Sequence, residues 1–394
     1  MDKEKIAGLD RNVFFTGITS FFTDTSIKMI YSVMPLFLLS IGASKTSISL
    51  IEGIAESTAS LLKAFSGYWS DKIGKNKPLM VIGYGITALV TPLYALVGKP
   101  VHVLLLRFVE RVGKGVRTAP RDSLISGSAE KNESGRNFGF HKAMDNSGAI
   151  IGPLAAFFFL FLFPGAYRKI FLFASIPAVL GVLTLILFVH EARGKNKNNH
   201  SGFRLSLLPK KFYFFLFIIF IFTLGNSSDA LLLVKTAETG VAENRVPFIY
   251  MLFNGVSVFL AIPIGKLSDR IGREKLIIAG FLVYALVYFF FGKFNSIQVF
   301  IPLFLFYGLY SALTDTAQKA LVSDLVSSEL RGTGYGIYHA VLGITLLPAS
   351  LIAGSLYDKV DANIPFYFGS VMSGIACILM IVFMLYYRKK ARTS

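Results

Sequence analysis

Long runs of apolar residues, separated by short polar segments, make up most of this chain of 394 residues. Each run is about 20 residues or longer, the length that a helix needs to cross a hydrocarbon core of ~30 Å. The runs lack the short alternation of barrel strands, and a helix satisfies its backbone groups internally. The pattern predicts twelve spans, near 12–41, 46–68, 78–97, 101–122, 134–160, 168–190, 211–236, 243–265, 274–292, 297–320, 331–357 and 364–387. We therefore predict an all-α membrane protein with twelve transmembrane helices.

The longest polar segment lies in the middle of the chain. Residues 190–211 are rich in Lys, Asn and Gly, a composition that is typical of a flexible loop. Six predicted spans precede this segment and six follow it. We therefore predict an N-terminal six-helix bundle over residues 1–190, a cytoplasmic linker over 191–210 and a C-terminal six-helix bundle over 211–394.

A short charged phrase occurs twice, between the second and third spans of each half. It reads GYWSDKIGKNK at 67–77 and GKLSDRIGREK at 265–275. A second match aligns GRNFGFHKA at 135–143 with GTGYGIYHA at 332–340. Matched positions in both halves indicate two related six-helix bundles arranged as a parallel repeat, the plan of many transporters.

Composition supports a membrane protein and narrows its partners. Hydrophobic residues make up 54% of the chain and charged residues 16%, against ~25% charged in soluble domains. The formal net charge of +17 could indicate nucleic acid, but the basic residues gather in loops that share one side if the spans alternate. The positive-inside rule assigns that side, and both termini, to the cytoplasm. We expect a multi-pass protein of the plasma (inner) membrane that contacts lipid and no nucleic acid.

Motifs for other classes of activity are missing from the sequence. Cys377 is the single cysteine, and the five histidines show no spacing typical of metal ligands. There is no arrangement of nucleophile and base, and no phosphate-binding loop for a nucleotide. We therefore expect that the chain is not an enzyme, needs no cofactor, holds no metal and is not driven directly by ATP.

The repeated phrase resembles the signature loop of the major facilitator superfamily. The matching residues are Gly67, Asp71, Lys72, Gly74, Lys75 and Lys77 in the first copy, and Gly265, Asp269, Arg270, Gly272, Arg273 and Lys275 in the second. The resemblance implies a secondary transporter that works by alternating access. In that family the loop aspartate caps the N-terminus of a helix in the other half, so the resemblance implies a gating role for Asp71 and Asp269.

A narrower resemblance covers four further segments: FTDTS at 22–26, LIEGIAESTAS at 50–60, RTAPRD at 117–122 and GFHKAMD at 139–145. They are similar to a prokaryotic subgroup of the superfamily related to nickel, cobalt and multidrug exporters. Lys28 stands where that subgroup is expected to have an acid. Because the charge at this position is reversed, the substrates of those relatives are a weaker guide to the substrate of this chain.

The fourth predicted span has a row of cations. They are Arg107, Arg111, Lys114, Arg117 and Arg121, and their spacing of three or four residues places them on one face of a helix. Each such charge at the bilayer centre costs ~2.5–3.5 kcal/mol, so the row must face water or meet carboxylates. Possible partners in the same half are the acids Asp24, Glu52, Glu56, Glu110 and Asp145. Lys28 lies one turn after Asp24, and His141 lies one turn before Asp145. We interpret these groups as proton-coupling or cavity residues, with structural ion pairs as the alternative.

The C-terminal half is poorer in charge, which suggests that it shapes the substrate site. Its candidate residues are Asn226, Asp229, Asn254, Tyr307, Tyr310 and Asp315. In the fifth span, Gly148, Gly152 and Pro153 form a candidate hinge. The spacing of these glycines resembles a motif of major-facilitator antiporters and implies export, whereas close helix packing is the simpler interpretation.

Three transport functions remain open from the sequence. The leading hypothesis is a proton-coupled antiporter that exports a small solute, acting as a monomer. The second is proton-coupled uptake of a small organic anion such as a polycarboxylate or a carboxylate siderophore, because the cationic row would attract negative charge. The third is efflux of a divalent metal such as nickel or cobalt, for which carboxylates are available.

Overall fold

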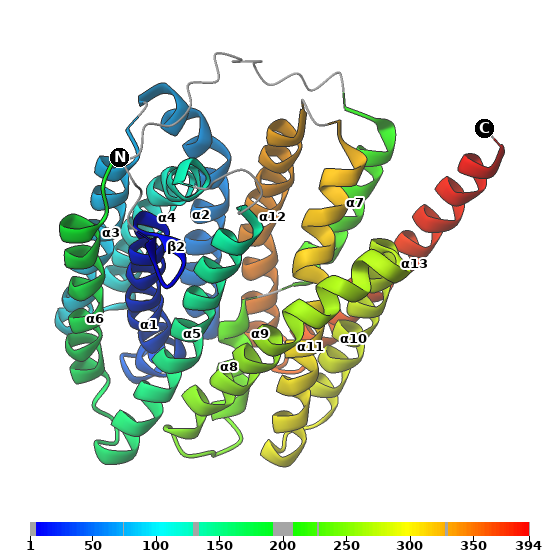
Figure 1. The fold of residues 1–394 in the computed structure, drawn as a ribbon. Helices are drawn as coiled ribbons and strands as arrows, with labels where there is room; N and C mark the ends of the chain where they lie inside the picture. The colour runs from blue at the N-terminus through cyan, green and yellow to red at the C-terminus, as the bar shows by residue number, and fades with distance from the viewer. Residues whose placement is uncertain are drawn as a thin grey trace. The chain divides into compact units, whose positions relative to one another are not determined.

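The computed structural model describes residues 5–73, 75–128, 134–191, 208–226, 228–327 and 330–393. Over these ranges the chain forms thirteen α-helices, one short 3-10 helix and a two-stranded hairpin (Figure 1). Eight segments are long and apolar enough by composition to cross a membrane: Lys77–Leu96, Arg136–Leu162, Tyr167–Phe188, Lys210–Ala237, Arg273–Lys293, Ile297–Leu325, Thr333–Lys359 and Ile364–Tyr387. Four helices fall outside this set: α1 (Arg11–Ser40), α2 (Lys45–Ile73), α4 (Pro100–Ser128) and α9 (Arg245–Ile271). Of these, α1 and α4 contain many of the charged residues singled out above. The all-α membrane fold is confirmed.

The helix bounds follow the predicted spans closely. The N-terminal half contains β1 (Lys5–Ile6), β2 (Leu9–Asp10), α1 (Arg11–Ser40), α2 (Lys45–Ile73), α3 (Lys77–Leu93), the 3-10 helix η1 (Tyr94–Leu96), α4 (Pro100–Ser128), α5 (Ser134–Leu162) and α6 (Tyr167–Phe188). The C-terminal half contains α7 (Lys210–Gly225), α8 (Asp229–Ala237), α9 (Arg245–Ile271), α10 (Arg273–Lys293), α11 (Ile297–Leu325), α12 (Arg331–Lys359) and α13 (Ile364–Thr393).

The seventh predicted span differs, because it consists of two helices. Helix α7 ends at Gly225, and α8 begins at Asp229. The Ser228 side chain accepts a hydrogen bond of 3.2 Å from the backbone N–H of Ala230, so it caps the start of α8. Asn226 and Ser228 favour turns and caps, which is the local reason for a break at this point.

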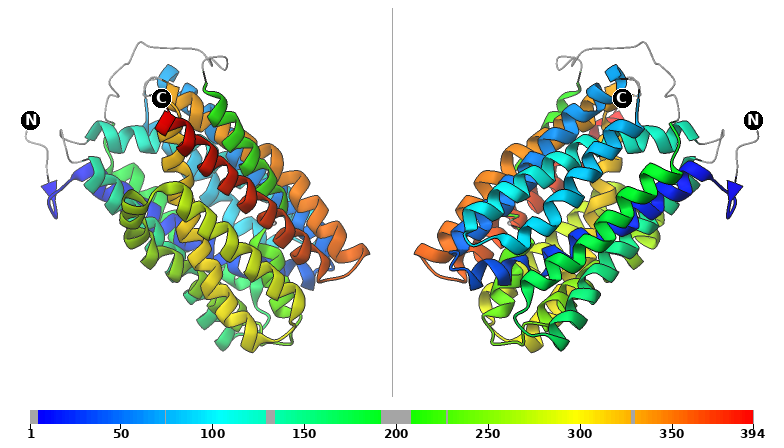
Figure 2. Two further views of the ribbon diagram at one scale, coloured as in Figure 1. Left: turned by 90° about the vertical axis from the view of Figure 1, so that its right-hand side faces the viewer. Right: turned by 90° about the vertical axis from the view of Figure 1, so that its left-hand side faces the viewer.

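Corresponding helices make the same contacts in the two halves. Helix α1 packs on α5 and α6, while α3 packs on α4 and α6. In the same way, α7 packs on α12 and α13, while α10 packs on α11 and α13. The neighbouring pair α1 and α6, in dark blue and green, can be followed side by side in Figure 2. The repeated scheme is what the duplicated sequence phrases predicted.

The chain divides into two compact units. Unit 1 comprises Met1–Ala43, Thr58–His200 and Ala242–Met251, and unit 2 comprises Ser44–Ser57, Ser201–Val241 and Leu252–Ser394. The first part of α2 therefore belongs to unit 2, and the first part of α9 belongs to unit 1. The predicted bundle limits at 190 and 211 stay a prediction, because most of the segment 191–210 lies outside the described ranges.

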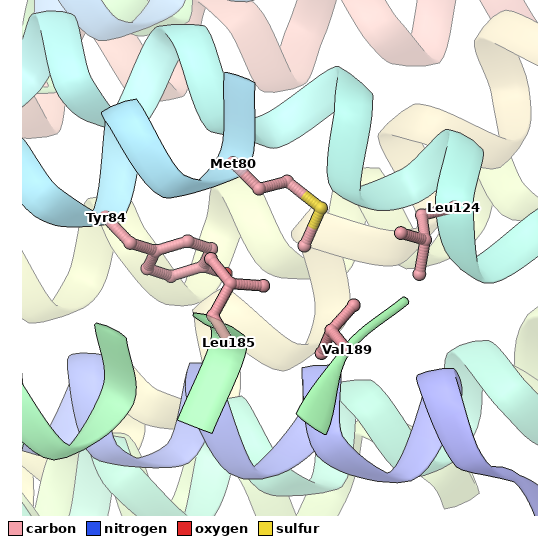
Figure 3. Close-up of a cluster of buried hydrophobic side chains, with 5 residues drawn as sticks. All are labelled: Met80, Tyr84, Leu124, Leu185 and Val189. Atoms are coloured by element: carbon pink, nitrogen blue, oxygen red, sulfur yellow. The ribbon is translucent and has the colours of Figure 1, made fainter. Parts of the chain in front are cut away.

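The core of unit 1 includes a buried apolar cluster. It consists of Met80, Tyr84, Leu124, Leu185 and Val189, contributed by α3, α4 and the end of α6 (Figure 3). Lipid is as apolar as these side chains, so the cluster acts through close packing rather than through removal of apolar surface from water. The ring of Tyr84 also joins this cluster to a buried cation described below.

Two glycines of α5 allow α1 to approach at backbone distance. A Cβ atom at Gly152 would lie 2.5 Å from the carbonyl oxygen of Thr25 and 2.8 Å from the backbone nitrogen of Met29. A Cβ atom at Gly148 would lie 2.9 Å from the backbone nitrogen of Thr25. Since real Cβ atoms do not come this close, only glycine fits both positions. Close packing of α5 on α1 is thus supported, and a hinge at Gly152 and Pro153 stays a prediction.

We predict that Gly152→Ala destabilises the protein and that Gly139→Ala on the same helix does not. The first substitution overpacks the contact with α1 and costs ~1–3 kcal/mol, whereas a Cβ at Gly139 meets no atom within 4 Å. Alanine also favours a helix over glycine by ~1 kcal/mol, so the control is neutral or slightly stabilising. Thermal unfolding of both purified variants measures the difference, and equal midpoints would contradict the packing role.

Candidate functional site

A first group of charges in unit 1 surrounds Asp24, which is half-buried on α1. The charged side chains that act on it most strongly are Asp145, Lys114, Arg117 and Lys28. Gly148 of α5 makes this approach possible, because a Cβ at that position would lie 3.1 Å from the Cβ of Asp24. The structure therefore brings together predicted site residues from α1, α4 and α5.

Arg107 belongs to a different contact within the same unit. Its side chain is 1% exposed, and its Nη1 lies 3.3 Å from Oε2 of Glu110. The hydroxyl of Tyr94 donates a 2.8 Å hydrogen bond to the same carboxylate oxygen. In the sequence, Asp24 was one of several possible partners of the row of cations that includes Arg107 and Arg111. In this conformation Lys114 and Arg117 act on Asp24 more strongly.

Arg117 is buried among neutral partners of α3. Its Nη1 donates a 2.7 Å hydrogen bond to the hydroxyl of Thr87, and its guanidinium carbon lies 4.3 Å from the ring centroid of Tyr84. Figure 3 shows that ring within the apolar cluster. Arg121 instead pairs with its neighbour Asp122 at 2.9 Å. The predicted row on α4 therefore consists of cations with different roles.

His141 and Asp145 form a pair on one face of α5. His141 Nδ1 lies 3.7 Å from Asp145 Oδ2, and the histidine is almost fully buried. Ionisable groups inside a membrane span are candidates for function. Because Asp145 also acts on Asp24, the pair connects α5 to the group on α1.

Lys28 lies among aromatic rings that the sequence did not indicate. Its Nζ donates a 3.0 Å hydrogen bond to the hydroxyl of Tyr250, in the part of α9 that belongs to unit 1. The same nitrogen lies 5.3 Å from the ring centroid of Tyr250 and 5.6 Å from that of Tyr31. Tyr31 follows Lys28 by one helical turn, so spacing could have identified it. Tyr250 is more than two hundred residues away, and no local signal identifies it.

Unit 2 contains a polar group at the break between α7 and α8. The hydroxyl of Tyr307 donates a 2.7 Å hydrogen bond to Asp229, and the amide of Asn226 lies 3.4 Å from the hydroxyl of Tyr310. The hydroxyl of Tyr284, which the sequence did not single out, donates to the carbonyl oxygen that α7 leaves at Gly225, at 3.1 Å. Four predicted substrate residues therefore meet at the broken helix.

The remaining predicted residues are more scattered. Asn254 is buried on α9, and Asp315 accepts a 3.0 Å hydrogen bond from Ser311 on the same helix. Glu52 is buried and Glu56 is half-buried, and both lie on the part of α2 that belongs to unit 2.

Most of the predicted gating residues cannot be placed. Gly67, Asp71, Lys72, Gly74 and Asp269 lie outside the residues whose side chains the structure describes. Arg270 is exposed, and Gly272 has a φ of 96°, a backbone conformation that favours glycine, immediately before α10.

Two helix N-termini are capped by acids from other helices. Glu191, just after α6, accepts hydrogen bonds from the backbone N–H groups of Asn76 and Lys77, at 2.9 and 3.1 Å. In unit 2, Asp358 of α12 accepts a 2.7 Å hydrogen bond from the backbone N–H of Thr46 at the start of α2. Carboxylates favour such positions because they meet unsatisfied N–H groups and the positive end of the helix dipole.

A salt bridge and a hydrogen bond reinforce the cap on α2. Lys45 pairs with Glu238 at 3.2 Å, and the hydroxyl of Tyr357 donates to the same carboxylate. The sequence did not indicate this contact, because spacing along a chain does not show which helix end an acid will reach.

The part of the chain that the structure describes holds no group of three or more His, Cys, Asp or Glu side chains that could bind a metal ion.

Comparison with known proteins identifies the family. The Major Facilitator Superfamily model matches residues 16–235 and 214–394. An uncharacterised MFS-type transporter of Methanocaldococcus jannaschii is 37% identical over 382 residues, which cover 95% of each chain. The quinolone resistance protein NorA of Staphylococcus aureus is 23% identical over 94% of this chain and 97% of its own. The crystal structure of a POT family transporter in complex with 5-aminolevulinic acid covers 98% of both chains with a TM-score of 0.82 and 12% identity, a likeness of fold alone. The chain belongs to the major facilitator superfamily of membrane transporters.

Proposed function

We propose that the chain is a proton-coupled secondary transporter of a small solute, with Asp24 as the coupling carboxylate. The observation that carries this proposal is the setting of Asp24 on α1, in the combined field of Asp145, Lys114 and Arg117. A coupling group must hold a proton in one part of the cycle and lose it in another. Asp145 and the two cations have opposite charges and lie on other helices than Asp24. Movement of α4 and α5 relative to α1 would therefore change the charge around this carboxyl during the transport cycle.

Export by antiport with protons is the leading direction. Two observations support it: the glycine spacing of α5, which resembles that of antiporters, and the similarity to a quinolone resistance protein. The chain would act as a monomer in the plasma (inner) membrane with both termini in the cytoplasm, the side to which the positive-inside rule assigns the basic loops.

Proton-coupled uptake of an organic anion is the second candidate, because the row of cations on α4 would attract negative charge. Arg107, Arg111 and Arg117 of this row are buried. Ionisable groups inside a membrane protein mark substrate and ion pathways.

The contact between α2 and α12 would take part in the transport cycle whether the solute is exported or taken up. Helix α2 begins in unit 2 and continues in unit 1. Any movement of one unit against the other must therefore bend α2 or release its start from α12. We propose that the cap by Asp358 is one of the contacts that opens and closes during alternating access, in addition to the predicted gates at Asp71 and Asp269.

We predict that Asp24→Asn abolishes accumulation driven by a pH gradient while downhill exchange of solute persists. The amide keeps the shape of the side chain but cannot carry a proton. Labelled solutes are first screened for transport by the wild type in inverted and right-side-out vesicles, with and without the gradient. Transport of a solute identified in this way is then measured for the variant and the wild type. The direction of accumulation distinguishes export from uptake. Asp122→Asn is the matched control, because that acid is paired and about half exposed.

Two other outcomes would contradict this role of Asp24. A well-folded Asn variant that still accumulates solute with normal proton dependence would make Glu56 or Asp145 the next candidate. Loss of folded protein would instead indicate a structural ion pair, since leaving a buried cation without its partner costs ~3–5 kcal/mol.

We also predict that Asp358→Ala loosens the start of α2. Loss of a capping side chain costs ~0.5–2 kcal/mol, so local opening becomes about two- to thirtyfold more frequent. In a Cys377→Ser background, a cysteine at the buried position Ser49 reports opening through its rate of thiol labelling. Asp361→Ala is the control, since Asp361 accepts a hydrogen bond from the nearby Asn363 and not from α2. Equal labelling rates in the two variants would exclude the cap as a gate.

A further inference from the structure

We propose that His141 and Asp145 of α5 form a proton relay between Asp24 and the cytoplasmic end of unit 1. This inference rests on the coupling role proposed above for Asp24, and it names the route by which a proton leaves that carboxyl for the cytoplasm. The proposed function needs only that Asp24 gains and loses a proton. The relay adds a task for each of the two α5 residues. All three side chains belong to unit 1.

The two relay residues lie on the face of α5 that packs on α1. Gly148 and Gly152 mark this face, because a Cβ at either position would meet the backbone of α1. His141 and Asp145 precede these glycines in one row, since the four positions follow at intervals of four, three and four residues. A Cβ at Gly148 would also lie 3.1 Å from the Cβ of Asp24, so the row leads along α5 to Asp24.

The contact between His141 and Asp145 is close to the geometry of proton transfer. His141 Nδ1 lies 3.7 Å from Asp145 Oδ2. A hydrogen bond is shorter, so transfer needs either a tightening of this contact or one bridging water molecule. The two residues are one helical turn apart on the same face, which keeps the imidazole and the carboxyl near each other. The pair therefore stays assembled whenever α5 moves as one helix.

Each group of the pair has a second polar atom that is buried. His141 Nε2 and Asp145 Oδ1 make no hydrogen bond within the part of the chain that the structure describes, and His141 is only 4% exposed. Buried polar atoms need a partner, and ordered water serves where the protein offers none. In a neutral imidazole one ring nitrogen donates while the other accepts. The pair therefore offers one atom at each end for a proton to arrive or leave.

A buried hydroxyl of α1 lies at the level of His141. Thr16 is 0% exposed, and its Oγ1 likewise makes no hydrogen bond to any residue that the structure describes. Its neighbour Gly17 packs on α5, because a Cβ at Gly17 would lie 2.6 Å from the ring of Phe140. Thr16 and His141 are thus next in sequence to two residues that are in contact. Several polar atoms in such a place favour ordered water, which can carry a proton to and from the ring.

The charged groups that act most strongly on His141 come from three helices. They are Asp24 on α1, Arg121 and Asp122 on α4, and Lys142 on α5 itself. Arg121 and Asp122 pair with each other at 2.9 Å, so their opposite charges largely offset one another. Helix α4 ends and α5 begins on the side that the positive-inside rule assigns to the cytoplasm. His141, one turn nearer to that side than Asp145, is therefore the group from which a proton leaves.

The proton moves in three balanced steps. Inward flow of protons supplies the energy in a proton-coupled transporter, so the working direction is from Asp24 to the cytoplasm. Protonated Asp24 gives its proton to the carboxylate of Asp145, and Asp145 then gives a proton to Nδ1 of neutral His141. The imidazolium releases its other proton, the one on Nε2, to water. Asp24 is then ionised, Asp145 is again a carboxylate and His141 is again neutral. Each passage leaves the ring in its Nδ1–H tautomer, and a turn of the ring restores the Nε2–H form.

The test follows the exchange of the His141 ring protons with water. The full chain is labelled with ¹⁵N-histidine and purified in detergent, and the His141 signals are identified by their absence in His141→Gln. NMR then measures proton exchange at each ring nitrogen. We expect exchange with water at both nitrogens. Asp145→Asn should slow exchange at Nδ1 by about tenfold or more, because the carboxylate next to this nitrogen is lost, and Asp145→Glu should largely restore it.

The matched control is Asp122→Asn. This change also removes a negative charge that acts on His141, but Asp122 is outside the relay, so exchange at Nδ1 should stay as in the wild type. If Asp145→Asn does not yield folded protein, Asp145→Leu replaces it with the same expectation, since an apolar side chain suits a membrane helix. A histidine with a structural role alone predicts one fixed tautomer and slow exchange at both nitrogens. That result would overturn the relay, as would an Nδ1 exchange rate that Asp145→Asn leaves unchanged or that Asp122→Asn slows equally.

The measurement separates the relay from the coupling role of Asp24. Ring exchange is measured without a solute and without a pH gradient, so its result does not depend on transport. Gradient-driven transport by Asp24→Asn is the independent measurement. A fixed His141 tautomer together with lost coupling in Asp24→Asn would contradict the relay alone. Ring exchange as expected together with normal coupling in Asp24→Asn would contradict the coupling role of Asp24 and support the relay from Asp145 onwards.

Discussion

The cost of placing charge in hydrocarbon is the constraint on which the rest of this structure depends. Helix α4 has a row of cations that no lipid could solvate, so α4 must meet other helices along that face. Carboxylates, hydroxyls and aromatic rings of the protein contact these cations. Glu110 pairs with Arg107, and Arg117 contacts the hydroxyl of Thr87 and the ring of Tyr84. The glycines of α5 let α1 approach at backbone distance, which places Asp24 directly beside α5.

The buried charges fall into two kinds. Arg107, Glu110 and Tyr94 form a compact set in which one carboxylate has two donors, an arrangement suited to holding helices in place. Asp24 is different, since it experiences both an acid and several cations from neighbouring helices. A group under opposing influences changes its protonation with small shifts in geometry, whereas a group with matched donors does not. This contrast is why Asp24 rather than Glu110 is the better coupling candidate.

The sequence predicted the helices, the repeat and the family, because each leaves a local mark: apolar length, a duplicated phrase and a signature loop. It also singled out most charged residues of the candidate site, since a charge within an apolar run is conspicuous, and their roles stay a prediction. It could not identify their partners. Asp24 and Glu110 were both possible partners of the row on α4, and tertiary packing set Arg107 beside Glu110 and Tyr31. Tyr250 and Asp358 were missed because a tyrosine or a helix-end acid has no local feature that shows which distant segment it contacts.

The charge of the substrate determines whether the substrate and the proton move in the same direction or in opposite directions, because both interact with the charged side chains around Asp24. In the proposed coupling role, protonation of Asp24 would remove a negative charge from a group that includes Lys114 and Arg117. An anion would therefore bind more tightly to the protonated protein, and by reciprocity the proton would bind more tightly when the anion is present. Such mutual reinforcement is the condition for moving both in the same direction. A cationic solute would compete with the proton instead, which is the condition for exchange. The charge of the solute thus bears on mechanism as well as on specificity, because it decides between uptake with protons and export in exchange for them.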